Sequence, residues 1–184
     1  RLRCSSLAGH VCLQVPFNMS QTRGFSVGCT FRSVVKNQVG FTTSKTEDTL
    51  STQYCTDIAK MVQSPSFHVI GDDPDAVMFV TKLALDYRNK FKRDVVIDLV
   101  CYRRHGHNEA DEPNATQPLM YQTVKKHPVP RQLYADQLTE EGTVEAHEVE
   151  KLISEYRAAR DPGACVLEDW RPLTAASEAS RANL

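Results

Sequence analysis

The stretch from Val95 to Pro113 constrains the fold of this chain more than any other. It begins with an apolar run, Val95 to Val100, that is short and rich in β-branched residues, as buried parallel strands are. The run then gives way abruptly to ionisable side chains between Arg103 and Glu112. In open parallel sheets, ligands bind at the carboxyl ends of the strands. We therefore predict an α/β protein in which the loop after this strand faces a ligand.

The best-specified helix lies just before this strand. Asp73 is a favourable N-cap residue, and Pro74 suits the first helical position. An apolar strand at Phe67–Ile70, the helix at 74–91 and the strand at 95–101 form a βαβ unit, and such a unit makes its two strands parallel. The fold class that follows is α/β, with a mainly parallel sheet and flanking helices. The predicted apolar stripe of the helix consists of Ala76, Val80, Leu83, Ala84, Tyr87 and Phe91.

Other elements are predicted from shorter patterns. Thr30–Val35 reads as a further strand, and it ends in the loop Lys36–Gly40. Residues 1–172 are expected to form a partial α/β domain, and residues 173–184 a disordered tail. The remaining expectations are a helix that ends at Gly24, a loop at 42–52, helices at 57–63, 118–126, 130–140 and 144–160, and a strand or docked tail at 166–170.

Composition excludes several classes of protein. The 184 residues carry 22 basic and 23 acidic side chains, and this balance argues against a nucleic-acid or membrane-surface partner. No apolar run approaches the roughly 20 residues of a membrane span. The six cysteines have no C-x-x-C spacing, which favours reduced thiols in a cytosolic protein over disulfides or structural zinc. The chain starts at Arg1 without an initiator Met, so we expect part of a longer protein.

Two polar loops follow predicted strands, Lys36–Gly40 and Arg103–Pro113. If both strands belong to one parallel sheet, both loops lie at the same edge. That edge would carry oxygen atoms from Asn37 and Val39, together with cations from Arg103, Arg104 and His107. Oxygen ligands suit Mg²⁺, which is usually shared with substrate phosphates, and arginine suits phosphate oxygens. We therefore expect a cofactor that carries a pyrophosphate.

Simpler interpretations remain open for the same residues. His105, His107 and Asp111 would suit a metal hydrolase, although an H-x-H pattern alone is a weak signal. The whole loop would equally serve as a solvated connection, and Asn37 as an ordinary turn residue. His68 lies in an apolar strand and is expected to be a core histidine with a hydrogen-bond partner.

Long sequence segments between Asn37 and Pro172 resemble those of one family, the thiamine-diphosphate-dependent first component of the 2-oxoglutarate dehydrogenase complex. The resemblance covers roughly four-fifths of the chain. The sequence near His127 is closer to bacterial members than to mitochondrial ones, so we expect a bacterial cytoplasmic protein, or a mitochondrial matrix protein if the source is eukaryotic. The segments that carry the resemblance are NQVGFTTS, STQYCTDIAKMVQ, FVTKLALDYRN, FKRDVVIDLVCYRRHGHNEADEP, TQPLMYQ and HPVPRQLYADQL.

The resemblance implies a diphosphate-binding α/β domain that works with a pyrimidine-binding domain elsewhere in a homodimeric parent enzyme. That enzyme decarboxylates 2-oxoglutarate oxidatively with thiamine diphosphate and Mg²⁺, and it passes the succinyl group to a lipoyl-bearing succinyltransferase component. By position, Asn37 matches a magnesium-ligating asparagine and Val39 a ligating carbonyl. His107 and Arg103 match the loop that covers the cofactor diphosphate.

The N-terminal stretch departs from the family pattern. An aspartate that ligates magnesium is expected 33 residues before Asn37, and Cys4 stands at that position. A thiol is a poor ligand for Mg²⁺ because the ion prefers oxygen. Residues 1–16 are divergent throughout, and Cys29 and Lys36 replace an expected Gly and Asn. We expect the isolated chain to be inactive, and the alternative is a non-catalytic remnant that binds no cofactor.

Overall fold

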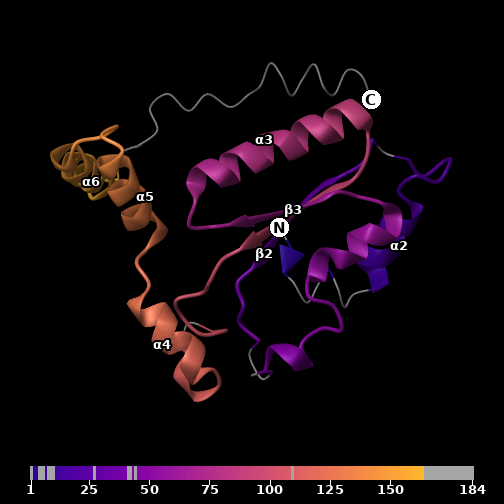
Figure 1. Cartoon of the computed structure of the whole chain (residues 1–184), viewed down its shortest axis with the longest axis horizontal. Coiled ribbons are helices and arrows are strands. Elements are labelled where there is room, and N and C mark those ends of the chain that lie inside the picture. Colours follow the sequence, from indigo (N-terminus) through magenta and orange to yellow (C-terminus); the bar gives the residue numbers. More distant parts are fainter. Residues whose placement is uncertain are drawn as a thin grey trace. The chain divides into compact units, whose positions relative to one another are not determined.

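The sheet consists of parallel strands in the order β1-β2-β4-β3 (Figure 1). The structure, a computed structural model, describes residues 2–3, 7, 11–26, 28–40, 43, 45–108 and 110–163. The strands are β1 (Leu2–Arg3), β2 (Phe31–Lys36), β3 (Ser66–Ile70) and β4 (Val95–Val100). The predicted α/β class and the three longer strands are confirmed, while the short β1 was not anticipated.

The βαβ unit is built as the sequence predicts. Helix α3 (Pro74–Phe91) begins where Oδ1 of Asp73 accepts a hydrogen bond of 2.9 Å from the backbone N–H of Ala76. Proline at the first helical position adds to this cap, because its fixed φ is already helical. The helix ends at Lys92, whose φ of 52° is left-handed, and the chain then enters β4 beside β3.

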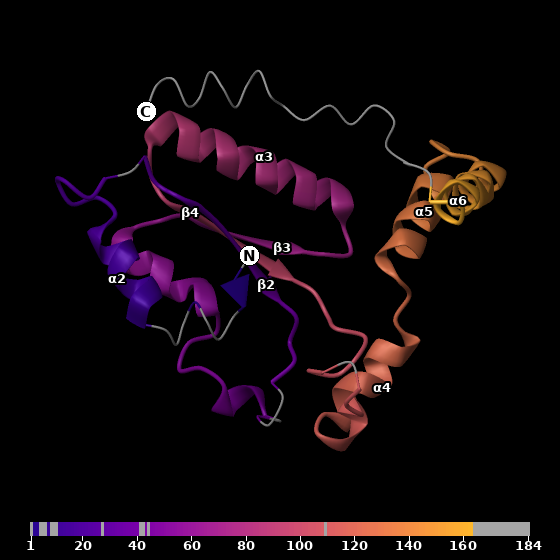
Figure 2. The same ribbon diagram turned by 180° about the vertical axis from the view of Figure 1, so that it is seen from behind.

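Helices cover both faces of the sheet. Helix α3 lies on one side of the strands, while α2 (Val11–Met19) and the 3₁₀ helix η2 (Cys55–Val62) lie on the other, as the two opposite views show (Figures 1 and 2). Alternate residues of β4 serve the two layers, because successive side chains of a strand point to opposite faces. Val95 and Ile97 pack towards α3, and Val96 packs towards α2 and η2.

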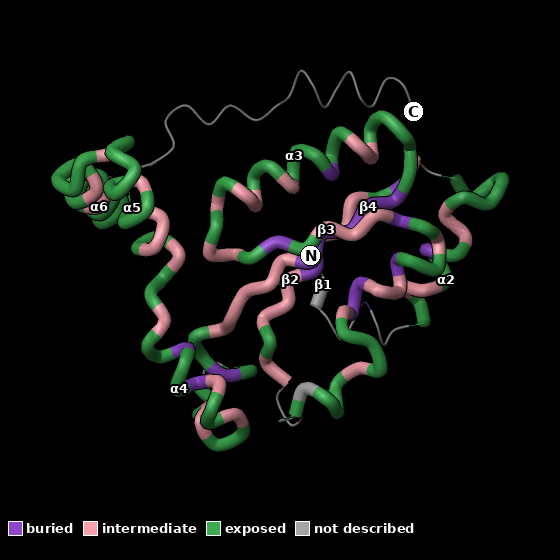
Figure 3. The backbone as a smooth tube through the Cα atoms, viewed as in Figure 1, coloured by how far each residue is buried: buried purple, intermediate pink, exposed green. Residues whose placement is uncertain are grey.

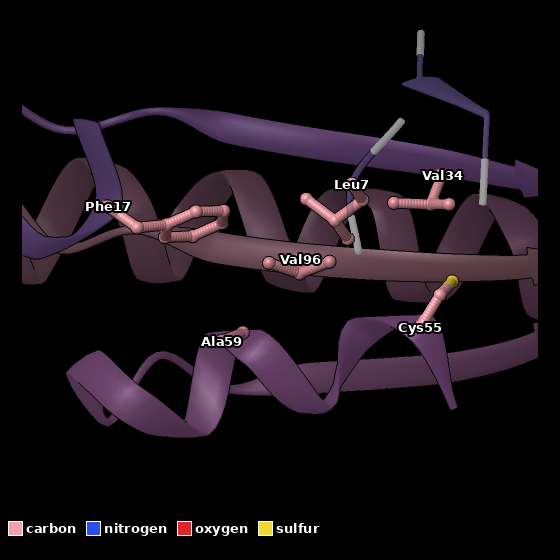
Figure 4. Packing of buried hydrophobic residues seen from close by; sticks show 6 residues of the cluster. All are labelled: Leu7, Phe17, Val34, Cys55, Ala59 and Val96. Atoms are coloured by element: carbon pink, nitrogen blue, oxygen red, sulfur yellow. The ribbon is translucent and has the colours of Figure 1, made fainter. Parts of the chain in front are cut away.

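The layer under α2 and η2 contains a small cluster of buried apolar side chains (Figure 4). Phe17 of α2, Val34 of β2 and Ala59 of η2 are all inaccessible to solvent. Burial is greatest along the first part of β4, where the run from 94 to 98 is buried throughout (Figure 3). The six residues of this cluster are Leu7, Phe17, Val34, Cys55, Ala59 and Val96.

A buried carboxylate, Asp94, joins the strands at the amino end of the sheet. Its Oδ1 accepts hydrogen bonds from the Thr30 N–H at 2.8 Å, from the Thr30 hydroxyl at 2.6 Å and from Arg32 at 2.8 Å. Ser64, just before β3, donates to the Asp94 backbone oxygen at 2.7 Å. The side chain of Asp94 is 3% exposed, so a buried carboxylate is the centre of the network that links β2, β3 and β4.

The remaining helices follow β4, except for the short η1, which lies between β2 and η2. The chain divides into two compact units, 1–134 and 135–184. None of the described helices is both long and apolar enough to cross a membrane. Residues 164–184, which include the expected strand at 166–170 and the expected tail, lie outside the described part. The helices are η1 (Thr46–Asp48), η3 (Pro113–Ala115), α4 (Pro118–Lys126), α5 (Pro130–Glu140) and α6 (Ala146–Arg160).

Three expectations need correction. Helix α2 is Val11–Met19, earlier than the helix predicted to end at Gly24, and it contains Pro16. Two members of the predicted α3 stripe, Leu83 and Phe91, are 42% and 55% exposed, because the inward arc of the helix is narrower than the stripe. His68 has a hydrogen-bond partner, as expected, and the partner is Asp98 at 3.0 Å. Its side chain is nevertheless 40% exposed, because β3 is the outermost strand of the described sheet.

The Asp94 network predicts a pH-dependent stability. Burial acts to raise the pKa of Asp94, but the hydrogen bonds from Thr30 and the charge of Arg32 outweigh it and hold the pKa below its ordinary value. The charged form therefore stabilises the fold above the ordinary aspartate pKa of about 3.9, and this contribution is lost as pH falls through the lower folded pKa. We expect Asp94→Asn to lower the free energy of unfolding by about 2 kcal/mol at pH 7.

Urea unfolding of wild type and variant between pH 7 and pH 3 measures both effects. The difference between the two proteins should shrink as the pH falls below about 4. Asp86→Asn makes the same chemical change on the exposed surface of α3 and should leave the stability almost unchanged. A gap between wild type and Asp94→Asn that stays constant over this range would contradict the assignment.

Candidate functional site

The two loops singled out in the sequence begin at the same edge of the sheet. Strands β2 and β4 are adjacent and parallel, and their last residues, Lys36 and Val100, are paired in the register. The backbone N–H of Cys101 donates to the Lys36 oxygen at 2.9 Å, which extends the pairing one residue beyond β4. The Gln38 side chain then donates to the Cys101 oxygen at 2.8 Å. The expectation that Asn37 and the His107 loop leave a common edge is confirmed.

The first loop, which we call the asparagine loop (Asn37–Gly40 with Thr43), is a tight turn. Oδ1 of Asn37 accepts a hydrogen bond of 3.3 Å from the backbone N–H of Val39, which holds the side-chain oxygen near its own backbone. Gln38 has a left-handed φ of 61°. A Cβ atom at Gly40 would collide with the backbone oxygen of Thr43, so only glycine fits there.

The second loop, which we call the histidine loop (Arg103–Asp111), folds back on itself. Asp111 closes it, because its side chain accepts from the Asn108 N–H at 3.1 Å and its own N–H donates to the Asn108 oxygen at 3.0 Å. Gly106 is buried inside the turn, and a Cβ there would lie 2.8 Å from the Asp111 oxygen. The hydroxyl of Tyr121, from α4, donates to the His105 backbone oxygen at 3.0 Å.

The predicted cations of this edge have different surroundings. Arg104 donates to the Tyr102 hydroxyl at 3.0 Å and to the His127 backbone oxygen at 3.3 Å. These bonds indicate a structural role for Arg104 and not a role in phosphate binding. Arg103 is half-buried, and its charge acts on Tyr121: burial raises the pKa of that phenol, and Arg103 partly offsets the rise. His107 is exposed. Arg103 and His107 therefore remain the candidates for phosphate contact.

The metal-hydrolase interpretation finds no support in the geometry. Among the described residues, no three His, Cys, Asp or Glu side chains come together as a metal site, and this includes His105, His107 and Asp111. The backbone of His105 and the carboxylate of Asp111 instead hold the histidine loop in shape. The H-x-H pattern thus marks a structured turn around Gly106.

Sequence reasoning missed several residues that support the edge. His127, to which no role was given, lies 2.8 Å from the Asp72 carboxylate through Nε2, and its ring meets Tyr102 edge-on. Gln38 and Tyr121 were also overlooked, although Gln38 bonds to the Cys101 oxygen just after β4 and Tyr121 bonds to the histidine loop. The one sequence signal that could have identified any of them is the position of Gln38 between the two candidate ligands Asn37 and Val39.

The donor atoms fit a magnesium diphosphate in part. The asparagine loop offers an amide oxygen from Asn37 and a backbone oxygen from Val39, and both are hard ligands of the kind Mg²⁺ takes. A carbonyl-type oxygen has two lone pairs, so the turn bond of Asn37 leaves one for a metal. Cys4, at the position of a third expected ligand, lies outside the described residues.

Comparison with known proteins decides the family. The family described as "Dehydrogenase E1 component" matches residues 9–161. The chain belongs to this family. A 2-oxoglutarate dehydrogenase E1 component of Haemophilus influenzae is 56% identical over 172 residues, which are 94% of this chain and 18% of that protein.

Other relatives also carry 2-oxoglutarate in their names. The 2-oxoglutarate dehydrogenase E1 component of Azotobacter vinelandii is 60% identical over 180 residues, covering 91% of this chain and 19% of the relative. A "Multifunctional 2-oxoglutarate metabolism enzyme" of Mycolicibacterium vanbaalenii is 45% identical over 153 residues, covering 83% of this chain and 12% of the relative. The chain therefore spans less than a fifth of the length of the curated relatives it matches.

The tight packing of Gly40 predicts a sharp response to one methyl group. Gly40→Ala forces the Thr43 backbone to move, and we expect a loss of about 1–3 kcal/mol in the free energy of unfolding. Gly71, at the end of β3, is the matched control, since a Cβ there meets its nearest atoms at an ordinary 3.4 Å. Urea unfolding of both variants compares them. Equal stability of Gly40→Ala and Gly71→Ala would show that the asparagine loop is not closely packed.

Proposed function

We propose that this chain binds the magnesium diphosphate of thiamine diphosphate as part of an enzyme that oxidatively decarboxylates 2-oxoglutarate. The names of the E1 relatives support the substrate. The observation that carries the proposal is the common edge, where a loop with two oxygen donors and a loop with two cationic candidates leave adjacent parallel strands. Ligands of parallel sheets bind at such carboxyl ends.

Each loop has a separate task in this proposal. Asn37 and Val39 would hold Mg²⁺ through their oxygen atoms, and the turn bond between them keeps both oxygens on one short segment. Arg103 and His107 would bind the phosphate oxygens, Arg103 with its planar fork and His107 as a single donor. When bound, thiamine diphosphate supplies the carbanion chemistry that removes carbon dioxide from a 2-oxo acid. The residues of this chain anchor and orient the cofactor.

The partners follow from the same proposal. The chain would act together with the rest of the parent polypeptide, in a homodimer, and the parent enzyme would transfer the succinyl group to a lipoyl-bearing succinyltransferase component. We propose the bacterial cytoplasm as its location, because the relatives of high identity are bacterial. A second candidate function, a remnant that binds no cofactor, is favoured by Cys4 at the position where an aspartate is expected.

Calorimetry with the 184-residue chain separates the two candidates. We expect thiamine diphosphate to bind at micromolar concentration when Mg²⁺ is present and much more weakly when EDTA removes it. Asn37→Ala should weaken the Mg²⁺-dependent binding by about tenfold or more, because it removes a metal ligand. Asn89→Ala, on the exposed surface of α3, is the matched control. Absence of binding at millimolar cofactor would support the remnant.

Cys4 provides a further test. Cys4→Asp replaces a soft thiol by a hard carboxylate ligand, so it should strengthen the Mg²⁺-dependent binding of thiamine diphosphate. We expect an increase of about tenfold, within the range found when the support of a metal site changes. Cys12→Asp, on the exposed α2 helix, controls for added charge. An affinity unchanged by Cys4→Asp would mean that residue 4 does not lie at the aspartate position.

A further inference from the structure

The first turn of α4 contacts both loops of the candidate site. Tyr121, four residues after Gln117, donates its hydroxyl hydrogen to the His105 backbone oxygen at 3.0 Å. Gln117 donates from its side-chain amide to the Thr43 backbone oxygen at 3.3 Å. Residues four apart in a helix lie on the same side, so one short segment reaches the asparagine loop and the histidine loop at once.

The segment from Gln117 to Tyr121 is rigid enough to couple the positions of the two loops. Tyr121 is 1% exposed and is the largest fully buried side chain of the described residues. Its backbone N–H donates to the Gln117 oxygen at 3.1 Å, so the two contact residues are joined by the first hydrogen bond of α4. Pro118 between them restricts the backbone further. A shift of one contact would therefore move the other.

The two loops are otherwise joined mainly at their base. The pairing of Cys101 with Lys36 and the Gln38 bond to Cys101 lie next to the strand ends. Thr43 and His105 are further along their loops, and the contacts of Gln117 and Tyr121 are made there. At Gly40, a Cβ would also lie 3.3 Å from the Gln117 amide, so the helix turn packs closely against the asparagine loop.

We propose that Gln117 and Tyr121 are positioning residues that fix the distance between the metal-binding asparagine loop and the phosphate-binding histidine loop. This inference rests on the proposed function for its purpose, because a magnesium ion and a diphosphate in mutual contact require both loops at one spacing. It assigns to α4 a role that does not involve touching the cofactor. The role is to make magnesium and diphosphate bind cooperatively.

Two nearly isosteric variants break the contacts one at a time. Tyr121→Phe removes the hydroxyl that reaches His105, and Gln117→Glu replaces the amide donor that reaches Thr43 by an acceptor. Tyr134→Phe is the matched control, because it removes a hydroxyl that donates to Asp75, at the start of α3. All variants are made in the 184-residue chain, and thermal unfolding verifies that each one folds.

Hydrogen exchange tests the coupling without any ligand. In Tyr121→Phe, the amides of the asparagine loop should exchange about fivefold faster, although the hydroxyl of Tyr121 bonds to the histidine loop. This is the change expected from one lost hydrogen bond. Gln117→Glu should have the reciprocal effect on the histidine loop. The amides of β4 should keep their protection in both variants and in Tyr134→Phe. Faster exchange confined to the loop that lost its contact would overturn the proposal.

Cofactor binding distinguishes failure of this inference from failure of the proposed function. Raising the Mg²⁺ concentration should increase the thiamine diphosphate affinity of wild type. The factor of this increase should be at least about threefold smaller in Tyr121→Phe and in Gln117→Glu. The double variant should show no larger reduction than the single variants. If wild type binds and the factor is unchanged or the two effects are additive, α4 has no positioning role, although the proposed function stands. If wild type does not bind, the proposed function fails, and hydrogen exchange alone decides whether α4 couples the loops.

Discussion

The parallel pairing of β2 with β4 is the interaction on which the rest of this structure depends. The register runs from Phe31 with Val95 to Lys36 with Val100, so both strands end at the same level. A shift of one residue would turn either Val34 or Val96 away from the cluster under α2 and η2, because side chains alternate between faces. The core thus fixes the register, and the register brings the asparagine and histidine loops to one edge.

The two ends of the sheet have different properties. At the amino end, Asp94 is buried and its Oδ1 accepts three hydrogen bonds from β2 and its approach. At the carboxyl end, the loops are held largely by backbone oxygens and single side chains, and candidate groups such as His107 remain exposed. The network at the amino end therefore stabilises the strand order. The polar groups at the carboxyl end are not needed for that purpose and can contact a ligand.

Local signals explain which parts of the fold could be predicted from sequence. Helices α3, α4 and α5 were predicted with the bounds observed, and each begins with a proline, whose fixed φ and missing N–H mark a helix start. Helix α2 was not predicted because it contains Pro16 and leaves Val11 and Val15 exposed, so it shows neither a typical start nor a clear apolar stripe.

The sequence predicted where the candidate site lies, but it did not predict the hydrogen bonds that hold its two loops in place. The common edge follows from a general rule of parallel sheets, so Asn37 and His107 could be placed near it without coordinates. The bonds of Tyr121 to His105 and Gln117 to Thr43 depend on where α4 packs after the chain has turned at Gly106. No periodic pattern in the sequence encodes such a contact, and Asp72 with His127 is a similar case.

Paramagnetic broadening in the nuclear magnetic resonance spectrum tests most directly whether both loops bind one metal diphosphate. Mn²⁺ replaces Mg²⁺ at oxygen ligands and broadens the signals of nearby nuclei. With Mn²⁺ and thiamine diphosphate bound, we expect the amide signals of Val39 and His107 to broaden together, while that of Asp94, at the opposite end of the sheet, stays sharp. Broadening of only one loop, or of Asp94 as strongly as the loops, would contradict a shared site.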